Sequence, residues 1–295
     1  MSETATAPAQ TVVPPISLRR RLTDKAMTGA AVLTVFIVLA PLVAIFGYLV
    51  YRGIGSLNWA FLTHTPTPVG ETGGGMANAI VGSVMILAIA SVIGVPFGVG
   101  AGIYLSEFGR NRFGGIIRFT ADVLNGVPSI VIGIVGYAIV VLYQHHFSAL
   151  AGGVALSIMM VPTICRTTEE MLLLVPQALR EAAYGLGVPR WRTTLSIVLR
   201  TATSGVITGI MLAFARIAGE TAPLLFTTLG NQFWNLRYDQ PTAALPLQIY
   251  VYANSAYEDW HRQAWAGSFV LIVLIVSSVA AVRYVVRRGT LGGTA

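Results

Sequence analysis

The amino-acid sequence predicts an all-α integral membrane protein with six transmembrane helices. Hydrophobic residues make up 55% of its 295 positions and charged residues only 11%, whereas about a quarter of an ordinary soluble protein is charged. The apolar residues are grouped in runs of about 20, the length that crosses a bilayer. Arginines gather at the ends of these runs, which is typical of segments that flank a membrane.

Six apolar runs are long enough to be spans, and we expect one domain, residues 27–288, to contain them. The first run is too long for the core of a signal peptide, so it is expected to be a retained span. A polar, proline-containing segment, 1–26, is expected to be a disordered tail, and 289–295 a short C-terminal tail. The runs cover residues 28–50, 78–105, 115–143, 148–174, 203–229 and 264–286.

Basic residues are unevenly shared between the two sides of this bundle. If the spans alternate in direction, one side carries only Arg52, Arg237 and Arg262. The positive-inside rule therefore places both termini, on the richer side, in the cytoplasm. It also accounts for the net charge of +7 without a nucleic-acid partner. The richer side carries Arg19, Arg20, Arg21, Lys25, Arg110, Arg112, Arg180, Arg190, Arg192, Arg200, Arg283, Arg287 and Arg288.

Small residues and turn-forming residues predict how the spans pack and connect. Gly94, Gly98 and Gly102 recur every four residues in the second run, a spacing that lets two membrane helices approach closely. The outer loop 52–77 is rich in Gly, Pro and Thr and is expected to be irregular. The loop 230–263 is long enough for a short helix or two on the outer mouth.

The fifth run holds two charged residues near its middle, Arg216 and Glu220. Such charges cost about 2.5–3.5 kcal/mol on insertion scales and usually serve function. The planar donors of arginine match a tetrahedral oxyanion, so Arg216 is predicted to contact an anion, with the Thr221 hydroxyl nearby. Glu220, at i+4, would share its helix face and neutralise it at rest. A purely architectural ion pair between helices is the alternative.

The third run is interrupted by residues that break a helix: Asn125, Gly126, Pro128 and Ser129. A half-helix that begins at Pro128 would point free N–H groups at whatever lies before it, and an anion would suit them. Asn125 and Ser129 are therefore predicted to line the same path as Arg216. A proline kink that serves only packing is an equally good interpretation.

Charged residues also lie at the inner ends of the third and fourth runs. Arg118 and Asp122 are four residues apart and are predicted to pair with each other or with the loop that follows the fourth run. Glu169 and Glu170, with Arg166, are predicted to support that loop.

The inner loop 176–200 is predicted to contain a short helix over 178–186, ended by Gly187 and Pro189. A short surface helix of this kind can dock in the groove of a partner protein. It can equally be an amphipathic helix that lies on the membrane.

Several strings in this chain resemble motifs of one family. Glu181, Ala182, Ala183 and Gly187 match the spacing of the EAA loop of ABC-importer permeases, with Arg200 where that family usually has proline. The strings "ARIAGETAPLL" and "ALPLQIYVYAN" resemble the A-type permease subunits of phosphate-specific transport (Pst) systems. The string "LNGVPSIVIG" is similar to a third-span motif of phosphate, sulfate and molybdate permeases. The resemblance covers about residues 75–285.

This resemblance implies a six-helix permease of the MetI-like type whose EAA loop is a cytoplasmic coupling helix. The implied function is that of a permease subunit of an ATP-driven importer of inorganic phosphate in a bacterial inner membrane. Implied partners are a second, PstC-like permease, a PstB-like ATPase dimer and a PstS-like extracytoplasmic phosphate-binding protein. A permease for sulfate or molybdate, and an ion-coupled anion transporter, remain as alternatives. A membrane enzyme acting on lipid phosphate is disfavoured, since no His or Asp lies near Arg216 in sequence.

The chain itself is expected to bind no cofactor or metal and to contain no catalytic residue. A nucleotide-binding Walker loop needs Gly-Lys, but the only lysine, Lys25, follows Asp24. ATP and Mg²⁺ are therefore assigned to the ATPase partner. The four histidines show no grouping with carboxylates that is typical of a metal site, and the single cysteine, Cys165, allows no intrachain disulfide.

Overall fold

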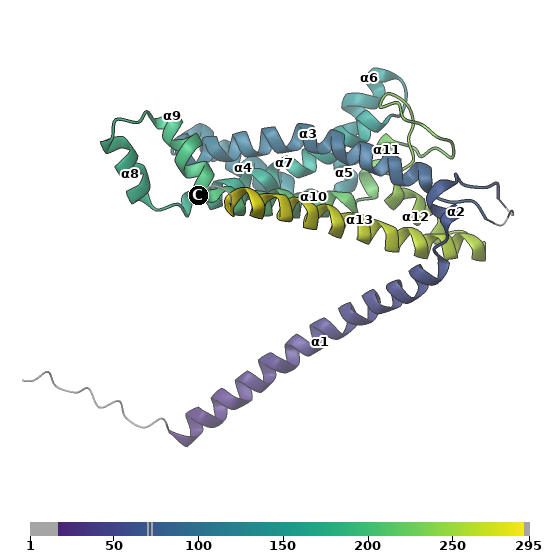
Figure 1. The fold of residues 1–295 in the computed structure, drawn as a ribbon, viewed down its shortest axis with the longest axis horizontal. Coiled ribbons are helices and arrows are strands. Elements are labelled where there is room, and N and C mark those ends of the chain that lie inside the picture. The colour runs from purple at the N-terminus through teal and green to yellow at the C-terminus, as the bar shows by residue number, and fades with distance from the viewer. Residues whose placement is uncertain (1–16, 70, 72, 292–295) are drawn as a thin grey trace, which may run out of the picture. The chain divides into compact units, whose positions relative to one another are not determined.

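A computed structural model describes residues 17–69, 71 and 73–291, with side chains as far as Tyr284. Helices dominate this part of the chain (Figure 1). Their bounds are α1 Leu18–Ser56, α2 Trp59–Thr63, α3 Ala77–Phe108, α4 Arg112–Gly126, α5 Ser129–Gly136, η1 (a π-helical turn) Tyr137–Val141, α6 Leu142–Gln144, α7 Ala149–Leu173, α8 Gln177–Gly185, α9 Arg190–Thr193, η2 (a second π-helical turn) Thr194–Val198, α10 Leu199–Ala218, α11 Ala222–Thr227, α12 Leu245–Ala253 and α13 Glu258–Leu291.

The chain divides after Val50 into two compact units, of which the first contains most of α1. This helix begins at Leu18, so residues 18–26 are helical and not part of a disordered tail. The stretch from 18 to 26 contains no Gly or Pro, and its residues therefore do not interrupt a helix. The rest of the expected tail, residues 1–16, lies outside the described residues. At the other end α13 extends to Leu291, and 292–295 are likewise not described.

Among the described residues, five helical stretches are long and apolar enough to cross a membrane: α1, α3, α7, α13 and the run 190–218. The pair α4 and α5–α6, bent by 107° at its break, makes a sixth if it is counted as one span. The all-α membrane fold is thus confirmed, with five to six spans in the described residues where six were expected. The fifth span differs from the predicted 203–229, because helix continues back through η2 and α9 and stops at Ala218.

The closest packing in the larger unit is between α3 and α7, which lie side by side in Figure 1. A methyl group added at Gly98 would lie 2.7 Å from Ile164 Cβ. One at Gly94 would lie 3.1 Å from Met160 Cβ, and one at Gly102 would lie 2.5 Å from Thr168 Cβ, one turn to either side along α7. The prediction that this glycine ridge serves helix packing is confirmed, and around it lies the main apolar core, to which α5, α10 and α11 also contribute.

The segments that connect the spans at the end opposite α8 follow the sequence expectation. Of the expected irregular loop 52–77, residues 52–56 are instead the end of α1, and the described residues between 57 and 76 are irregular apart from α2. The loop after α11 leads into the short helix α12. A second apolar cluster, with Phe61, Leu245 and Tyr252 among its members, ties these segments to α3 and α13. The end of the larger unit that carries α8 and α9 is called the α8 end below (Figure 1).

Candidate functional site

The fifth span is broken directly after Arg216. Helix α10 ends at Ala218 and α11 begins at Ala222, with Gly219, Glu220 and Thr221 between them. Pro223 explains the break, because it has no N–H to donate to the Gly219 carbonyl and its ring clashes with a continuing helix.

This break changes the predicted relation between the two charged residues. Glu220 lies beyond the helix that carries Arg216, so the expected shared helix face at i+4 is wrong. Arg216 is exposed and Glu220 half-buried. In the described part of the chain, neither side chain takes part in a hydrogen bond or an ion pair. The arginine is therefore open to a ligand or to another chain.

The third span is broken where the sequence predicted. Helix α4 ends at Gly126 and α5 begins at Ser129, with Pro128 extended at φ −56° and ψ 135°. The Thr163 hydroxyl donates to Asn125 Oδ1 at 3.0 Å. This bond leaves the amide N–H groups of Asn125 available to another acceptor.

Contacts with α7 place both breaks at one height. Methyl groups added at Gly205 and Gly209 would lie against Met171 and Thr167, so α10 and α7 run in opposite directions. Two further turns along α10 bring Arg216 level with Met160, near the middle of α7. Asn125 is bonded to Thr163 of the same helix, which is about 5 Å away along the axis.

The two short helices that follow the breaks lie side by side. A methyl group at Gly133 of α5 would lie 2.7 Å from Pro223 Cα, and one at Gly136 would lie 3.3 Å from Thr227 Cγ2. These contacts make α5 and α11 parallel, so the start of α5 at Ser129 lies beside the break 219–221 (Figure 1). Asn125, Ser129, Glu220 and Thr221 are thus brought to the level of Arg216.

The predicted coupling helix is present as α8, Gln177–Gly185. Gly187 follows it with φ +78°, a left-handed conformation that ends helices and favours glycine. Glu181 and Ala182 are exposed. Ala183 is only 3% exposed, so its side chain packs within this chain and is not available to a partner. The sequence predicted that Ala183 would contact the ATPase, and this is wrong. The buried face of α8 is set by the segments that pack against it, which the sequence motif does not show.

At the α8 end, four charged residues form a network between α4 and α7. Arg118 Nε lies 2.6 Å from Glu169 Oε1, and Arg166 lies 2.8 Å from Glu169 Oε2 and 3.1 Å from Asp122 Oδ1. The predicted Arg118–Asp122 pair is therefore wrong, because each residue finds a partner on α7 instead.

A second pair at the α8 end joins Glu107 of α3 to Arg180 of α8. Sequence reasoning missed this pair because no spacing relates residues on helices so far apart in the chain. The available signal was Glu107 itself, an acidic residue at the end of an apolar run in a chain with little charge.

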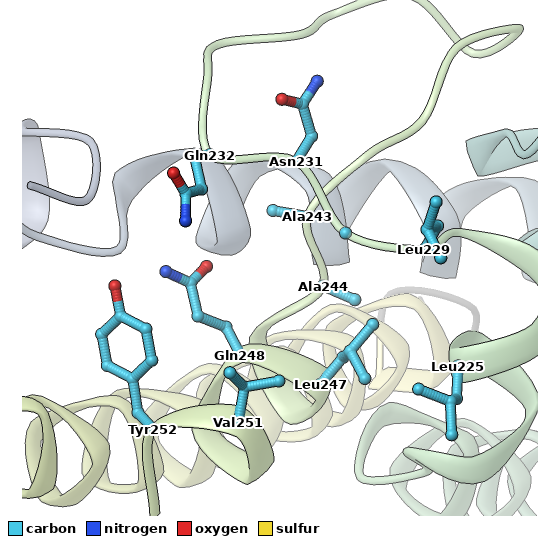
Figure 2. A pocket seen from close by; sticks show the side chains of 11 residues that line it. Leu225, Leu229, Asn231, Gln232, Ala243, Ala244, Leu247, Gln248, Val251 and Tyr252 are labelled. Atoms are coloured by element: carbon cyan, nitrogen blue, oxygen red, sulfur yellow. The ribbon is translucent and has the colours of Figure 1, made fainter. Parts of the chain in front are cut away.

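A cavity of about 260 Å³ lies beside α12, at the other end of the bundle (Figure 2). Figure 2 shows the amides of Gln232 and Gln248 pointing toward one another, near the Tyr252 ring, with leucines on the opposite side. The described residues that line it are all uncharged. This cavity therefore offers weak polar contacts to an anion and no compensating charge.

The class of protein follows from comparison with known folds and families. The chain is similar to chains of the MetNI methionine ABC transporter in inward-facing conformations, with TM-scores of 0.55 and 0.53 and 18% and 17% identity. The matches cover 75% and 72% of this chain and 98% and 93% of those chains, and at this identity they show the fold alone. Residues 94–290 match the family described as "Binding-protein-dependent transport system inner membrane component".

Curated relatives narrow the class further. The chain is 49% identical to the phosphate transport system permease protein PstA of Yersinia pestis, over 79% of this chain and 80% of the relative. It is 44% identical to the protein of the same name from Haemophilus influenzae, over 87% and 91%. The chain therefore belongs to the binding-protein-dependent transport inner membrane component family, and within it to the PstA permeases. It is a multi-pass membrane transporter subunit and not an enzyme.

Proposed function

We propose that this chain is the permease subunit through which an ATP-driven importer carries inorganic phosphate across a bacterial inner membrane. The observation that carries the proposal is Arg216, an exposed arginine at mid-height of the bundle, beside the breaks in two spans. The names of the relatives, phosphate transport system permease proteins, support phosphate as the anion.

The polar groups at this level can act together on a passing anion. Arg216 supplies two parallel N–H donors and a charge that persists without water. Asn125 offers its amide N–H groups, and Ser129 and Thr221 offer hydroxyls. Glu220 repels the anion and so limits how tightly it is held. A transport path needs such weak binding, because an anion that is bound strongly is not released.

The exposure of Arg216 requires a partner on that face. A guanidinium at mid-membrane is costly against lipid, so a second, PstC-like permease would cover it and complete the path. A PstS-like extracytoplasmic protein would deliver phosphate. The membrane-embedded chain would then need only a weak site, since selection occurs before the anion arrives.

Energy would come from a PstB-like ATPase dimer that binds ATP and Mg²⁺ and receives α8. The exposed residues Glu181 and Ala182, with Gly187 just beyond the end of α8, form the surface offered for docking. In this arrangement the α8 end and both termini lie in the cytoplasm, in keeping with the concentration of arginines there.

Uptake of labelled phosphate tests the function directly. Cells that lack this chain should take up phosphate at high affinity only when the wild-type chain is restored. Excess sulfate or molybdate should not compete. Uptake that sulfate or molybdate abolishes would assign a different oxyanion, and uptake that persists without ATP would indicate ion coupling.

Docking and orientation need separate measurements. Ala182→Arg should reduce co-purification of the ATPase, whereas Ala253→Arg, an exposed alanine of α12, should leave it unchanged.

The orientation is tested by cysteine labelling. In a chain with Cys165 replaced by serine, Gly185→Cys should be labelled only from the cytoplasm and Ala253→Cys only from outside. External labelling at position 185 would overturn the orientation.

A further inference from the structure

The last turn of α3, residues 105–109, is held by an arginine from α8. Arg180 forms an ion pair with Glu107, and its Nη2 donates to the Leu172 carbonyl at 2.8 Å. Both charged side chains are 9% exposed. The pair thus ties the exposed helix α8 to α3 and, through Leu172, to the end of α7.

An arginine from α4 holds the same turn of α3. Arg118 donates to the Gly109 carbonyl at 2.8 Å and to the Leu105 carbonyl at 3.0 Å. Carbonyls at the C-terminal end of a helix carry partial negative charge, so they favour a cation, although the Leu105 carbonyl also accepts from the Gly109 N–H at 3.2 Å. The third donor of Arg118, Nε, is bonded to Glu169 of α7.

Helix α8 is joined to this turn through polar contacts at least as much as through packing. A cavity of about 580 Å³ lies between them, lined by Glu107, Arg180, Gln177 and Ser106 among others. Across such a gap an apolar interface is incomplete. The charged pair is therefore a direct link between α8 and α3, beside the bond from Arg180 to the Leu172 carbonyl of α7 and the packing of α8 on η2.

We propose that the last turn of α3 is a mechanical joint that passes movement of α8 to the broken third span. In this proposal, which rests on the proposed function, Arg180 and Glu107 connect α8 to the joint, and Arg118 connects the joint to α4. Helix α4 ends at Gly126, next to the break that lies level with Arg216. Glu107, Arg180 and Arg118 are thus positioning residues for the transport step, although none of them lies at the path.

The proposal predicts a loss of coupling rather than a loss of assembly. In proteoliposomes that contain the complete transporter, Glu107→Gln should lower the phosphate moved per ATP hydrolysed by about fivefold or more, the size of a typical coupling between sites. ATPase recruitment should be retained. Glu170→Gln, an exposed carboxylate at the same end of the bundle, is the matched control and should keep the wild-type ratio.

Charge exchange distinguishes a joint from a general defect. The double variant Glu107→Arg with Arg180→Glu should recover most of the ratio, because the pair is restored in reverse. Glu107→Gln combined with Arg118→Gln should lower the ratio by less than the product of the two single effects, since both act on one connection.

Two results would overturn the proposal. One is a wild-type ratio in assembled Glu107→Gln and Arg180→Gln transporters. The other concerns the charge-exchanged variant, Glu107→Arg with Arg180→Glu, which serves if Glu107→Gln fails to assemble: a ratio that does not recover in the assembled variant would mean that the pair is only an anchor. Failure of the proposed function would instead appear as absence of phosphate transport by the wild-type complex.

Discussion

Arginines at two levels of this bundle have opposite surroundings. At the α8 end, Arg118, Arg166 and Arg180 are each bonded to a carboxylate, and two of them also to backbone carbonyls. At mid-height, Arg216 has no such partner within the described chain. Within one protein, the arginines that hold helices together are saturated by the chain itself. Arg216, which is not paired in this way, is the arginine that lies at the level of the two broken spans.

The largest effect on phosphate uptake should follow from replacing Arg216, which has no partner within the described chain. Arg216→Gln should lower phosphate uptake about a hundredfold, because two charge-assisted hydrogen bonds are together worth about 3 kcal/mol or more. Arg216→Lys keeps the charge but loses the fork of donors, so it should retain part of the activity. Uptake is measured in variants shown to reach the membrane and bind the ATPase.

Arg237→Gln is the control for this experiment, since Arg237 is an exposed arginine paired with Asp239 in the loop before α12. It should transport normally. Wild-type uptake in Arg216→Gln would show that Arg216, although it has no partner within the described chain, is not needed for transport.

At the α8 end, where the arginines are paired with carboxylates, replacing a carboxylate should lower the stability of the protein. Glu169 is 3% exposed and accepts bonds from both Arg118 and Arg166. Replacing it with Gln should cost about 3 kcal/mol, because the half-buried Arg118 and Arg166 both lose their shared, buried carboxylate. For a chain of this size the thermal midpoint of the purified protein should drop by roughly 5–10 °C.

The neighbouring Glu170 is exposed, so Glu170→Gln should leave the thermal midpoint nearly unchanged. Equal midpoints for the two variants would show that the network at the α8 end does not hold the helices.

A smaller effect is expected at Glu220, which shares the level of Arg216 without bonding to it. Glu220→Gln removes repulsion, so phosphate should bind more tightly and leave more slowly. We expect the maximal rate and the apparent KM for phosphate both to fall a few-fold. A raised KM would mean that Glu220 assists binding, contrary to the role given to it.

The smallest effect should come from the exposed Arg237–Asp239 pair. The Arg237 guanidinium donates to Asp239 and holds the pKa of that carboxyl below its usual value. Any stabilisation is therefore present at neutral pH and is lost as the pH falls through the lowered pKa. Because exposed pairs contribute little, Asp239→Asn should have nearly the wild-type thermal midpoint at pH 7. A large difference at pH 7 would show that this loop matters to stability.

Much of the fold could be predicted because length and hydropathy alone define a membrane span. The break at Pro128 could also be predicted, since proline interrupts a helix and Gly126 lies two residues before it. Pro223 likewise predicted an interruption of the fifth run, but not that the helix would already end at Ala218, because the run stays apolar through Leu224 and Leu225 and so looks continuous. The expected partnership of Arg216 and Glu220 failed for the same reason.

The charged network could not be predicted because it depends on which helices are neighbours. Arg118 and Glu169 are 51 residues apart, and no local spacing connects them. Ala183 illustrates the same limit on a smaller scale. Its motif was found from sequence, but whether it faces the chain or a partner depends on how α8 packs.

The glycine ridge between α3 and α7 has a consequence for experiments that follow this protein in motion. With backbones so close that a methyl group at Gly98 would clash with Ile164, the two helices cannot slide past or turn about one another without separating. Spin labels at Phe97 and Leu173, both exposed, should therefore report one unchanging separation throughout a transport cycle. That distance would serve as a fixed reference against which the displacement of the other helices can be measured.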